Sequence, residues 1–152
     1  MKKTIFITGA TSGIGKATAE IFAKQGHRLI ICGRRKEVLD NLQIQLSNFT
    51  DVYSLVFDVR NQQEVQNAIN SLPEDWKNID VLVNNAGNAH GLEPISDANI
   101  SDWDAMMDGN VKGLLYVSQP IIKLMKANNS GHIVNISSVA ARQNYTNGTV
   151  YC

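Results

Sequence analysis

A glycine-rich turn near the N-terminus is the first stretch whose residues could do chemistry. It reads Thr8-Gly9-Ala10-Thr11-Ser12-Gly13-Ile14-Gly15 and lies between an apolar run at 4–7 and helix-forming residues at 16–24. A strand, a glycine turn and a helix in this order are typical of the phosphate-binding corner of a dinucleotide-binding fold, because the N–H groups and the dipole at the helix start attract an anion. Gly9 would permit the sharp turn, while Gly13 and Gly15 would let the backbone approach a pyrophosphate.

The spacing of these glycines departs from the standard fingerprint. That fingerprint is G-x-G-x-x-G, whereas this turn has the pattern G-x-x-x-G-I-G. Either pattern alone is a weak signal, so a glycine-rich turn that binds nothing remains an alternative for this stretch by itself.

Two arginines follow the next apolar run, which covers 28–32. The chain continues there as Gly33-Arg34-Arg35, without an acidic residue. In a dinucleotide-binding fold, an acid near this place binds the 2′-hydroxyl of NAD, whereas an arginine accommodates the 2′-phosphate of NADP. Arg34 and Arg35 therefore predict NADP as the cofactor, with a solvated arginine pair in a turn as the alternative.

Apolar runs and helical stripes alternate along the chain that must position these groups. We predict strands at 4–7, 28–32, 51–57, 80–83 and 131–136, and helices at 16–24, 36–46, 62–71 and 102–128. Nearly continuous apolar strands that alternate with helices indicate an α/β fold, a Rossmann-type doubly wound parallel sheet covered on both faces. Asn61, with Glu64 three residues later, and Ser101 are the expected N-caps of the last two helices.

Polar and small residues occur at two places where a plain fold would not need them. Asn84-Asn85-Ala86-Gly87 follows the fourth strand, at the sheet edge where open α/β folds bind ligands, although a polar turn is the alternative. The long helix contains Gly109, Asn110, Gly113 and Pro120, which lower helix stability unless packing or function requires them.

The composition limits the classes of function. The chain has 152 residues, 43% hydrophobic and 18% charged, which suits one domain with a real core. Fourteen basic residues balance 14 acidic ones, so we expect no nucleic-acid partner. Cys32 and Cys152 make no disulfide framework, and the N-terminal apolar run is too short for a signal peptide or a membrane helix. We therefore expect a cytoplasmic protein without a membrane partner or a metal site.

Considered together, the motifs resemble those of the classical short-chain dehydrogenases/reductases over all 152 residues. The motifs are Thr8-Gly9-(x)3-Gly13-Ile14-Gly15, Asn84-Asn85-Ala86-Gly87, Asn110, Ser137-Ser138 and Tyr151, in this order. Stretches at 32–35, 57–60, 71–73, 79–83 and 91–94 further resemble the NADP-dependent 3-hydroxy acid (serine and allo-threonine) dehydrogenases, also described as malonic semialdehyde reductases.

The resemblance implies roles for individual residues. Tyr151 would be the acid/base that exchanges a proton with the substrate oxygen, and Ser138, thirteen residues earlier, would hydrogen-bond that oxygen. Asn110 would anchor a water in the proton relay. The alternatives are a strand-end hydroxyl that caps the backbone for Ser138 and a tolerated interior asparagine for Asn110. The implied cofactor-binding residues are Gly9, Thr11, Ser12, Gly13, Ile14, Gly15, Arg34, Arg35, Asp58, Val59, Asn85, Ala86 and Gly87, of which Asp58 and Val59 would contact adenine.

The implied reaction is hydride transfer between NADP(H) and a small hydroxy acid or its oxo form, of the serine, allo-threonine or 3-hydroxypropionate type. The alternatives are another NADP-dependent carbonyl reductase, of the 3-oxoacyl or sugar type, and a non-catalytic NADP-binding module. A non-catalytic module would not need Ser138 and Tyr151 at this spacing. The resemblance also implies a homotetramer in which the long helix forms an interface.

The end of the sequence leads to one more expectation. A free phenol has a pKa of about 10, so a tyrosine base needs a nearby cation. In the family a lysine four residues after the tyrosine supplies it, and this sequence ends at Cys152. We expect residues 1–152 to be a single dinucleotide-binding domain, incomplete at the C-terminus, whose last strands and helices are absent and whose turnover is impaired.

Overall fold

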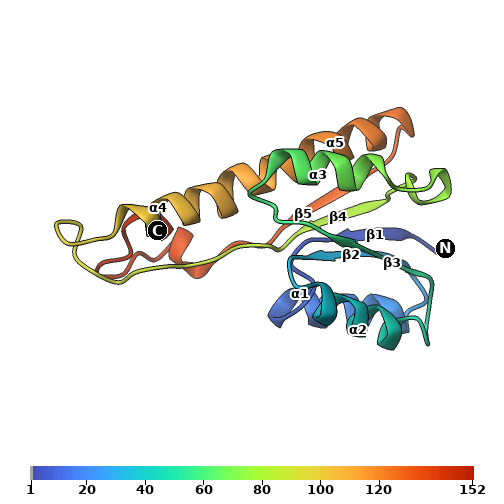
Figure 1. Ribbon diagram of the computed structural model, residues 1–152, viewed down its shortest axis with the longest axis horizontal. Coiled ribbons are helices and arrows are strands. Elements are labelled where there is room, and N and C mark those ends of the chain that lie inside the picture. The colour runs from blue at the N-terminus through green and yellow to red at the C-terminus, as the bar shows by residue number, and fades with distance from the viewer. Residues whose placement is uncertain (1) are drawn as a thin grey trace.

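Five parallel strands form the centre of the molecule in the computed structural model, which describes residues 2–152 (Figure 1). They are β1 (Thr4–Ile7), β2 (Arg28–Gly33), β3 (Val52–Val56), β4 (Val81–Asn84) and β5 (His132–Asn135). Their order in the sheet is β3-β2-β1-β4-β5, so the chain builds outward from β1 first to one side and then to the other. This is the doubly wound arrangement, and it confirms the predicted α/β fold class.

Helices cover the two faces of this sheet (Figure 1). On one face, α1 (Gly13–Lys24) and α2 (Lys36–Leu46) pack against Ile5, Ile7 and Leu29. On the other face, α3 (Gln62–Asn70) and α5 (Gly113–Ala127) pack against Phe6, Ile30 and Leu82. Neighbouring residues of a strand point to opposite faces, so strand positions that are buried on both sides are apolar, as at 5–7 and 29–32 here.

The long helix predicted over 102–128 is three segments. It begins as α4 (Ile100–Met106), continues as a π-helical segment (Met107–Lys112) and ends as α5. The predicted cap Ser101 is wrong. The helix begins at Ile100, so Asn99 is the cap residue, and its Oδ1 accepts hydrogen bonds from the Ser101 N–H at 3.0 Å and from the Ser101 hydroxyl at 2.9 Å.

Other boundaries agree with the sequence to within a few residues. Helix α1 begins at Gly13 rather than at residue 16, because the backbone already turns helical within the glycine-rich segment. Asn61 is confirmed as the cap of α3, since its Oδ1 accepts from the Gln63 and Glu64 N–H groups at 3.1 and 3.2 Å. After β5, the segment 139–152 contains the short 3₁₀ turns Val139–Ala141 and Thr149–Tyr151.

All five strands run in the same direction, so their carboxyl ends meet at one edge of the sheet. The glycine turn, the two arginines, Asp58 and the segments after β4 and β5 all begin at this edge. Within residues 2–152, no helix has both the length and the apolar character needed to cross a membrane.

Candidate functional site

A cavity of about 970 Å³ opens along the carboxyl edge of the sheet. Its size is at the upper end of the range usual for small-molecule and cofactor sites. It is lined by fifteen of the sixteen residues that the sequence predicts for the site: Gly9, Thr11, Ser12, Gly13, Ile14, Arg34, Arg35, Asp58, Val59, Asn85, Ala86, Gly87, Asn110, Ser138 and Tyr151. Gly15 is the exception and lies buried beneath the turn.

The glycine turn presents its backbone to this cavity. Gly9 and Gly13 have φ angles of +63° and +53°, which side chains with a Cβ rarely adopt. A Cβ on Gly15 would lie 2.4 Å from both the Gly9 carbonyl oxygen and Asn85 Nδ2, so this glycine serves close packing. Ser12 makes no side-chain cap, and the first turn of α1 has no acidic residue. The N–H groups at the start of α1 therefore remain available to an anion such as a pyrophosphate.

Thr8 and Asn85 hold this turn against the end of β4. The buried Thr8 hydroxyl accepts hydrogen bonds from the backbone N–H groups of Asn85 at 2.8 Å and Ala86 at 2.9 Å. In return, Asn85 Nδ2 donates to the carbonyl oxygens of Thr8 at 2.9 Å and Gly9 at 3.1 Å. The side chain of Asn85 is thus engaged in structure, although the residue also lines the cavity.

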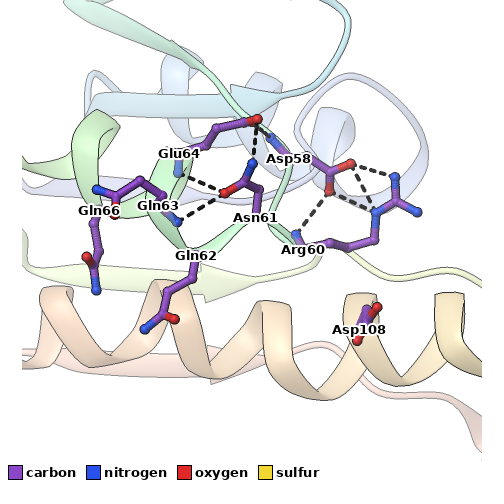
Figure 2. A pocket seen from close by; sticks show the side chains of 8 residues that line it. All are labelled: Asp58, Arg60, Asn61, Gln62, Gln63, Glu64, Gln66 and Asp108. Atoms are coloured by element: carbon purple, nitrogen blue, oxygen red, sulfur yellow. Dashed lines mark hydrogen bonds and ion pairs between the residues drawn. The ribbon is translucent and has the colours of Figure 1, made fainter.

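A basic corner lies where β2 and β3 end. Arg34 Nη1 is 3.6 Å from Asp58 Oδ2, and Arg35 Nη2 donates to the Thr11 hydroxyl at 3.2 Å. Arg60 holds Asp58 more closely: its Nε lies 3.1 and 3.0 Å from the two carboxylate oxygens, and its Nη2 is 2.7 Å from Oδ2 (Figure 2). Arg60 is a residue of this site that the sequence motifs do not reveal, because an Asp-x-Arg spacing at a strand end is also typical of an ordinary surface pair.

The pKa of Asp58 reflects these contacts. Partial burial by itself would raise it, but hydrogen bonds from the Arg60 side chain and backbone and the charges of Arg60 and Arg34 lower it below its usual value. The carboxylate is therefore ionised throughout the neutral range and is matched by neighbouring cations.

Asn110 accounts for the irregular stretch of the long helix. Its Nδ2 donates to the Asn88 carbonyl oxygen at 2.8 Å, and its Oδ1 accepts from the Asn88 N–H at 2.8 Å. Asn88 Nδ2 in turn donates to the Ala105 carbonyl oxygen at 3.2 Å, and a Cβ on Gly109 would lie 2.9 Å from the same nitrogen. The asparagine and the glycine are thus required by contact with the segment after β4. The role of Asn110 as a water anchor stays a prediction.

Ser138 and Tyr151 lie on the wall of the cavity that follows β5. Ser138 Oγ accepts from the Ala140 N–H at 3.2 Å, so the hydroxyl does cap the backbone there, while its proton remains free to be donated. Tyr151 is half-buried at the end of the last 3₁₀ turn. The structure brings both residues to one cavity, and no hydrogen bond joins their side chains among those that the described residues make.

Below this wall, Asn84 connects three elements. It is 4% exposed, and its Nδ2 donates to the Ser118 hydroxyl on α5 and to Asn135 Oδ1 on β5, both at 2.9 Å. Asn84 and Asn135 both line the cavity, so this network fixes its floor. Across residues 2–152, no group of three or more His, Cys, Asp and Glu side chains is placed to hold a metal ion.

Comparison with known proteins gives consistent matches. A family model described as short chain dehydrogenase matches residues 3–152. The chain is 44% identical over 147 residues to the NADP-dependent 3-hydroxy acid dehydrogenase YdfG of Escherichia coli O6:H1, covering 97% of this chain and 58% of that protein. It is also 41% identical over 152 residues to sulfoacetaldehyde reductase 2 of Chromohalobacter salexigens, covering 99% of this chain and 60% of that protein. The chain thus spans less than two thirds of the length of these relatives.

Solved structures agree with these relatives. Serine dehydrogenase from Escherichia coli superposes with a TM-score of 0.90 at 42% identity, over 97% of this chain and 68% of that one. The closed form of serine dehydrogenase complexed with NADP+ gives the same TM-score and identity, over 59% of its length. The fold, the cavity at the carboxyl edge and the match over residues 3–152 lead to one conclusion: this chain belongs to the short-chain dehydrogenase family.

Proposed function

We propose that this protein is an NADP-dependent oxidoreductase that acts on a small hydroxy acid or its oxo form. The observation that carries the proposal is the meeting, in one cavity, of an anion-binding glycine turn, an arginine corner and two hydroxyls at the spacing of the family's catalytic pair. The names of the relatives, among them a 3-hydroxy acid dehydrogenase, support the substrate class.

The cavity fits NADP in its chemistry. The open backbone at Gly13 and the uncapped start of α1 would hold the pyrophosphate. Arg34, whose side chain is 65% exposed, and Arg35 would bind the 2′-phosphate, because arginine offers paired donors to phosphate oxygens. Asp58 and Val59 would border the adenine. The complex of the related serine dehydrogenase with NADP+ supports this choice of cofactor.

The reacting end would lie beside Ser138 and Tyr151. A bound nicotinamide supplies or accepts the hydride. Tyr151 would exchange a proton with the substrate oxygen, and Ser138 would donate its free hydroxyl proton to the same oxygen as a hydrogen bond. Asn110 would hold a water behind Tyr151, with the N–H and the lone pair that its bonds to Asn88 leave unused.

We further propose that the protein assembles as a homotetramer through the outer face of α4, the π-helical segment and α5. Met107, Val111 and Leu115 recur there at every fourth position with 44%, 45% and 57% exposure. Such a stripe on a surface helix is typical of an interface. The cytoplasmic location stays a prediction from the sequence.

Activity with purified protein tests the reaction. For the protein that carries the family's lysine four residues after Tyr151, we expect NADP-dependent oxidation of serine, allo-threonine or 3-hydroxypropionate, followed through the absorbance of reduced nicotinamide. Residues 1–152 alone should show impaired turnover, because Tyr151 then lacks its cation. Ser138→Ala and Tyr151→Phe should each lower kcat by a factor on the order of 10²–10⁴, since both alter proton transfer in the transition state. Tyr145→Phe is the matched control, because Tyr145 is exposed and does not line the cavity. Equal loss in the control, or full activity in Tyr151→Phe, would contradict the proposed roles.

A further inference from the structure

Asp58 presents a difficulty for a cavity that is to bind a phosphorylated ribose. It is the only acidic side chain among the described residues that line the cavity. The register of β2 and β3 pairs Gly33 with Val56, so Arg34 and Asp58 leave the sheet side by side. A bare carboxylate at this place would repel a 2′-phosphate and would hold Arg34 as its own partner.

Arg60 reduces this difficulty by binding both oxygens of the Asp58 carboxylate. Its Nε and Nη2 reach the carboxylate at 2.7–3.1 Å, and its backbone N–H donates to Oδ1 at 3.0 Å. Figure 2 shows the Arg60 guanidinium beside the Asp58 carboxylate. Arg34 lies farther away, at 3.6 Å, and its side chain is 65% exposed. The two arginines thus differ: Arg60 is committed to the carboxylate, and Arg34 can turn toward a ligand.

The backbone around this pair is held as well. Glu64 Oε2 accepts from the Asp58 N–H at 3.0 Å, and Glu64 Oε1 accepts from Asn61 Nδ2 at 2.8 Å (Figure 2). The residues that cap α3 therefore fix the backbone position of Asp58, and with it the position of Arg60 two residues later. Among the charged residues that line the cavity here, Arg34, Arg35 and Arg60 outnumber the single Asp58, which gives these four a net charge of +2.

We infer that Arg60 is a positioning residue for cofactor selection: it neutralises Asp58, and so leaves Arg34 free to bind the 2′-phosphate that distinguishes NADP from NAD. This inference rests on the proposed use of NADP. It differs from a direct role, in which Arg60 would itself contact the phosphate. Removing the charge of Asp58 distinguishes the two roles. Arg60 then becomes dispensable if it acts through Asp58, and it stays necessary if it contacts the phosphate directly.

Binding of two small probes tests the inference. Adenosine 2′,5′-bisphosphate and 5′-AMP differ only by the 2′-phosphate, so the ratio of their affinities, measured by calorimetry on the purified protein, cancels effects on the adenine site. We expect Arg60→Gln to lower this ratio by about tenfold, the size of effect of one uncompensated charge near a partly exposed phosphate. Arg60→Lys should lower it less, since lysine keeps the charge but not the two-pronged geometry.

The double variant Asp58→Asn with Arg60→Gln is the decisive measurement. We expect its ratio to return to within about twofold of the wild-type ratio, because no stranded carboxylate remains to repel the phosphate or to hold Arg34. Lys77→Gln is the matched control. It removes the same charge from another residue paired with a carboxylate, Glu74, at the opposite edge of the sheet, and should leave the ratio unchanged.

Each contrary result has a distinct meaning. An unchanged ratio in Arg60→Gln overturns the inference, and so does a double variant as weak as Arg60→Gln, since that result assigns Arg60 a direct phosphate contact. A wild-type protein that binds both probes equally overturns the proposed use of NADP and the inference with it. If the wild type prefers the bisphosphate and Arg60→Gln keeps that preference unchanged, the inference is overturned while the proposed use of NADP stands.

Discussion

At the scale of single residues, the site depends on charges and hydroxyls that are already partnered by the protein. Arg34 is the least engaged of the cationic groups at the basic corner, with one contact at 3.6 Å. Thr8 is the most engaged of the hydroxyls, with two backbone N–H groups directed at its oxygen. Substitution of Arg34 should therefore change ligand binding, and substitution of Thr8 should change the stability of the fold.

Arg34→Asp should weaken NADP binding by about 1.5–3 kcal/mol, because it removes a charge-assisted phosphate contact. The new carboxylate would also stand next to Asp58 and raise the negative charge of the corner. NAD affinity should change much less, since NAD has no 2′-phosphate. Titration of both cofactors against the variant and the wild type measures the difference. An unchanged preference for NADP over NAD would rule out Arg34 as the phosphate ligand.

Thr8→Val should destabilise the fold by about 1–3 kcal/mol, because the backbone N–H groups of Asn85 and Ala86 lose their acceptor in a buried place. The free energy of unfolding in urea measures this loss. Thr4→Val is the matched control at the start of β1, the strand that Thr8 follows, since the Thr4 hydroxyl is in none of the hydrogen bonds that the described residues make. Thr4 is bonded to Asp80 through its backbone alone: its N–H donates to the carboxylate, and its carbonyl accepts from the Asp80 N–H. Equal losses of stability in the two variants would show that the hydrogen bonds of the Thr8 hydroxyl are not the source of the loss.

Asp58 should contribute stability that depends on pH. Its pKa is lowered in the folded protein, so the contribution is present above the unfolded pKa of about 3.9 and is lost as the pH falls through the folded value. Wild type should therefore be more stable than Asp58→Asn at pH 7, and the gap should close in strongly acidic solution. Urea unfolding of both proteins across this range measures it. A gap that does not change with pH would mean that the charge of Asp58 is not its source.

At the scale of elements, the long helix shows how far sequence patterns reach. The apolar stripe predicts a helix over 102–128, and the structure has helical backbone from Ile100 to Ala127. The stripe cannot predict the π-helical segment, because its cause is contact with Asn88, a residue outside the helix. Arg60 was missed for a similar reason, since the importance of its partner Asp58 depends on Arg34, which follows the neighbouring strand β2. Residues near one another in the sequence predict the helices and strands, whereas the π-helical segment and the role of Arg60 depend on contacts between distant segments.

Asn110→Ala should destabilise the protein by about 1–3 kcal/mol, because the Asn88 N–H and carbonyl both lose their partner. Helix propensity alone predicts the opposite sign, since alanine favours a helix more than asparagine does. Asn41→Ala is the matched control: Asn41 is exposed in the middle of α2 and should show neutral or increased stability. Urea unfolding compares the two. A stabilising Asn110→Ala would show that the bonds to Asn88 do not hold the π-helical segment.

At the scale of the whole molecule, the layered fold leaves one side of the long helix without a partner. Helix α5 packs on the sheet through Val117 and Ile121, whereas Met107, Val111 and Leu115 lie on exposed positions of the same continuous helix. The opposite layer shows a different pattern. Its exposed Ile21 on α1 has no large apolar side chain at i+4 or i−4, since the small Ala17 and the polar Gln25 occupy those positions. Ile21 therefore does not belong to a stripe of large apolar side chains at four-residue spacing, whereas Leu115 does.

Leu115→Glu should break the proposed homotetramer into smaller species, because a charge placed in the middle of an apolar interface must be desolvated without a partner. Size-exclusion chromatography with light scattering measures the mass, and circular dichroism checks that the subunit stays folded. Ile21→Glu is matched in size and charge and in exposure, 56% against 57% for Leu115, and should leave the assembly intact. A wild-type monomer would contradict the proposed assembly. A tetramer that survives Leu115→Glu would place its interface on another face.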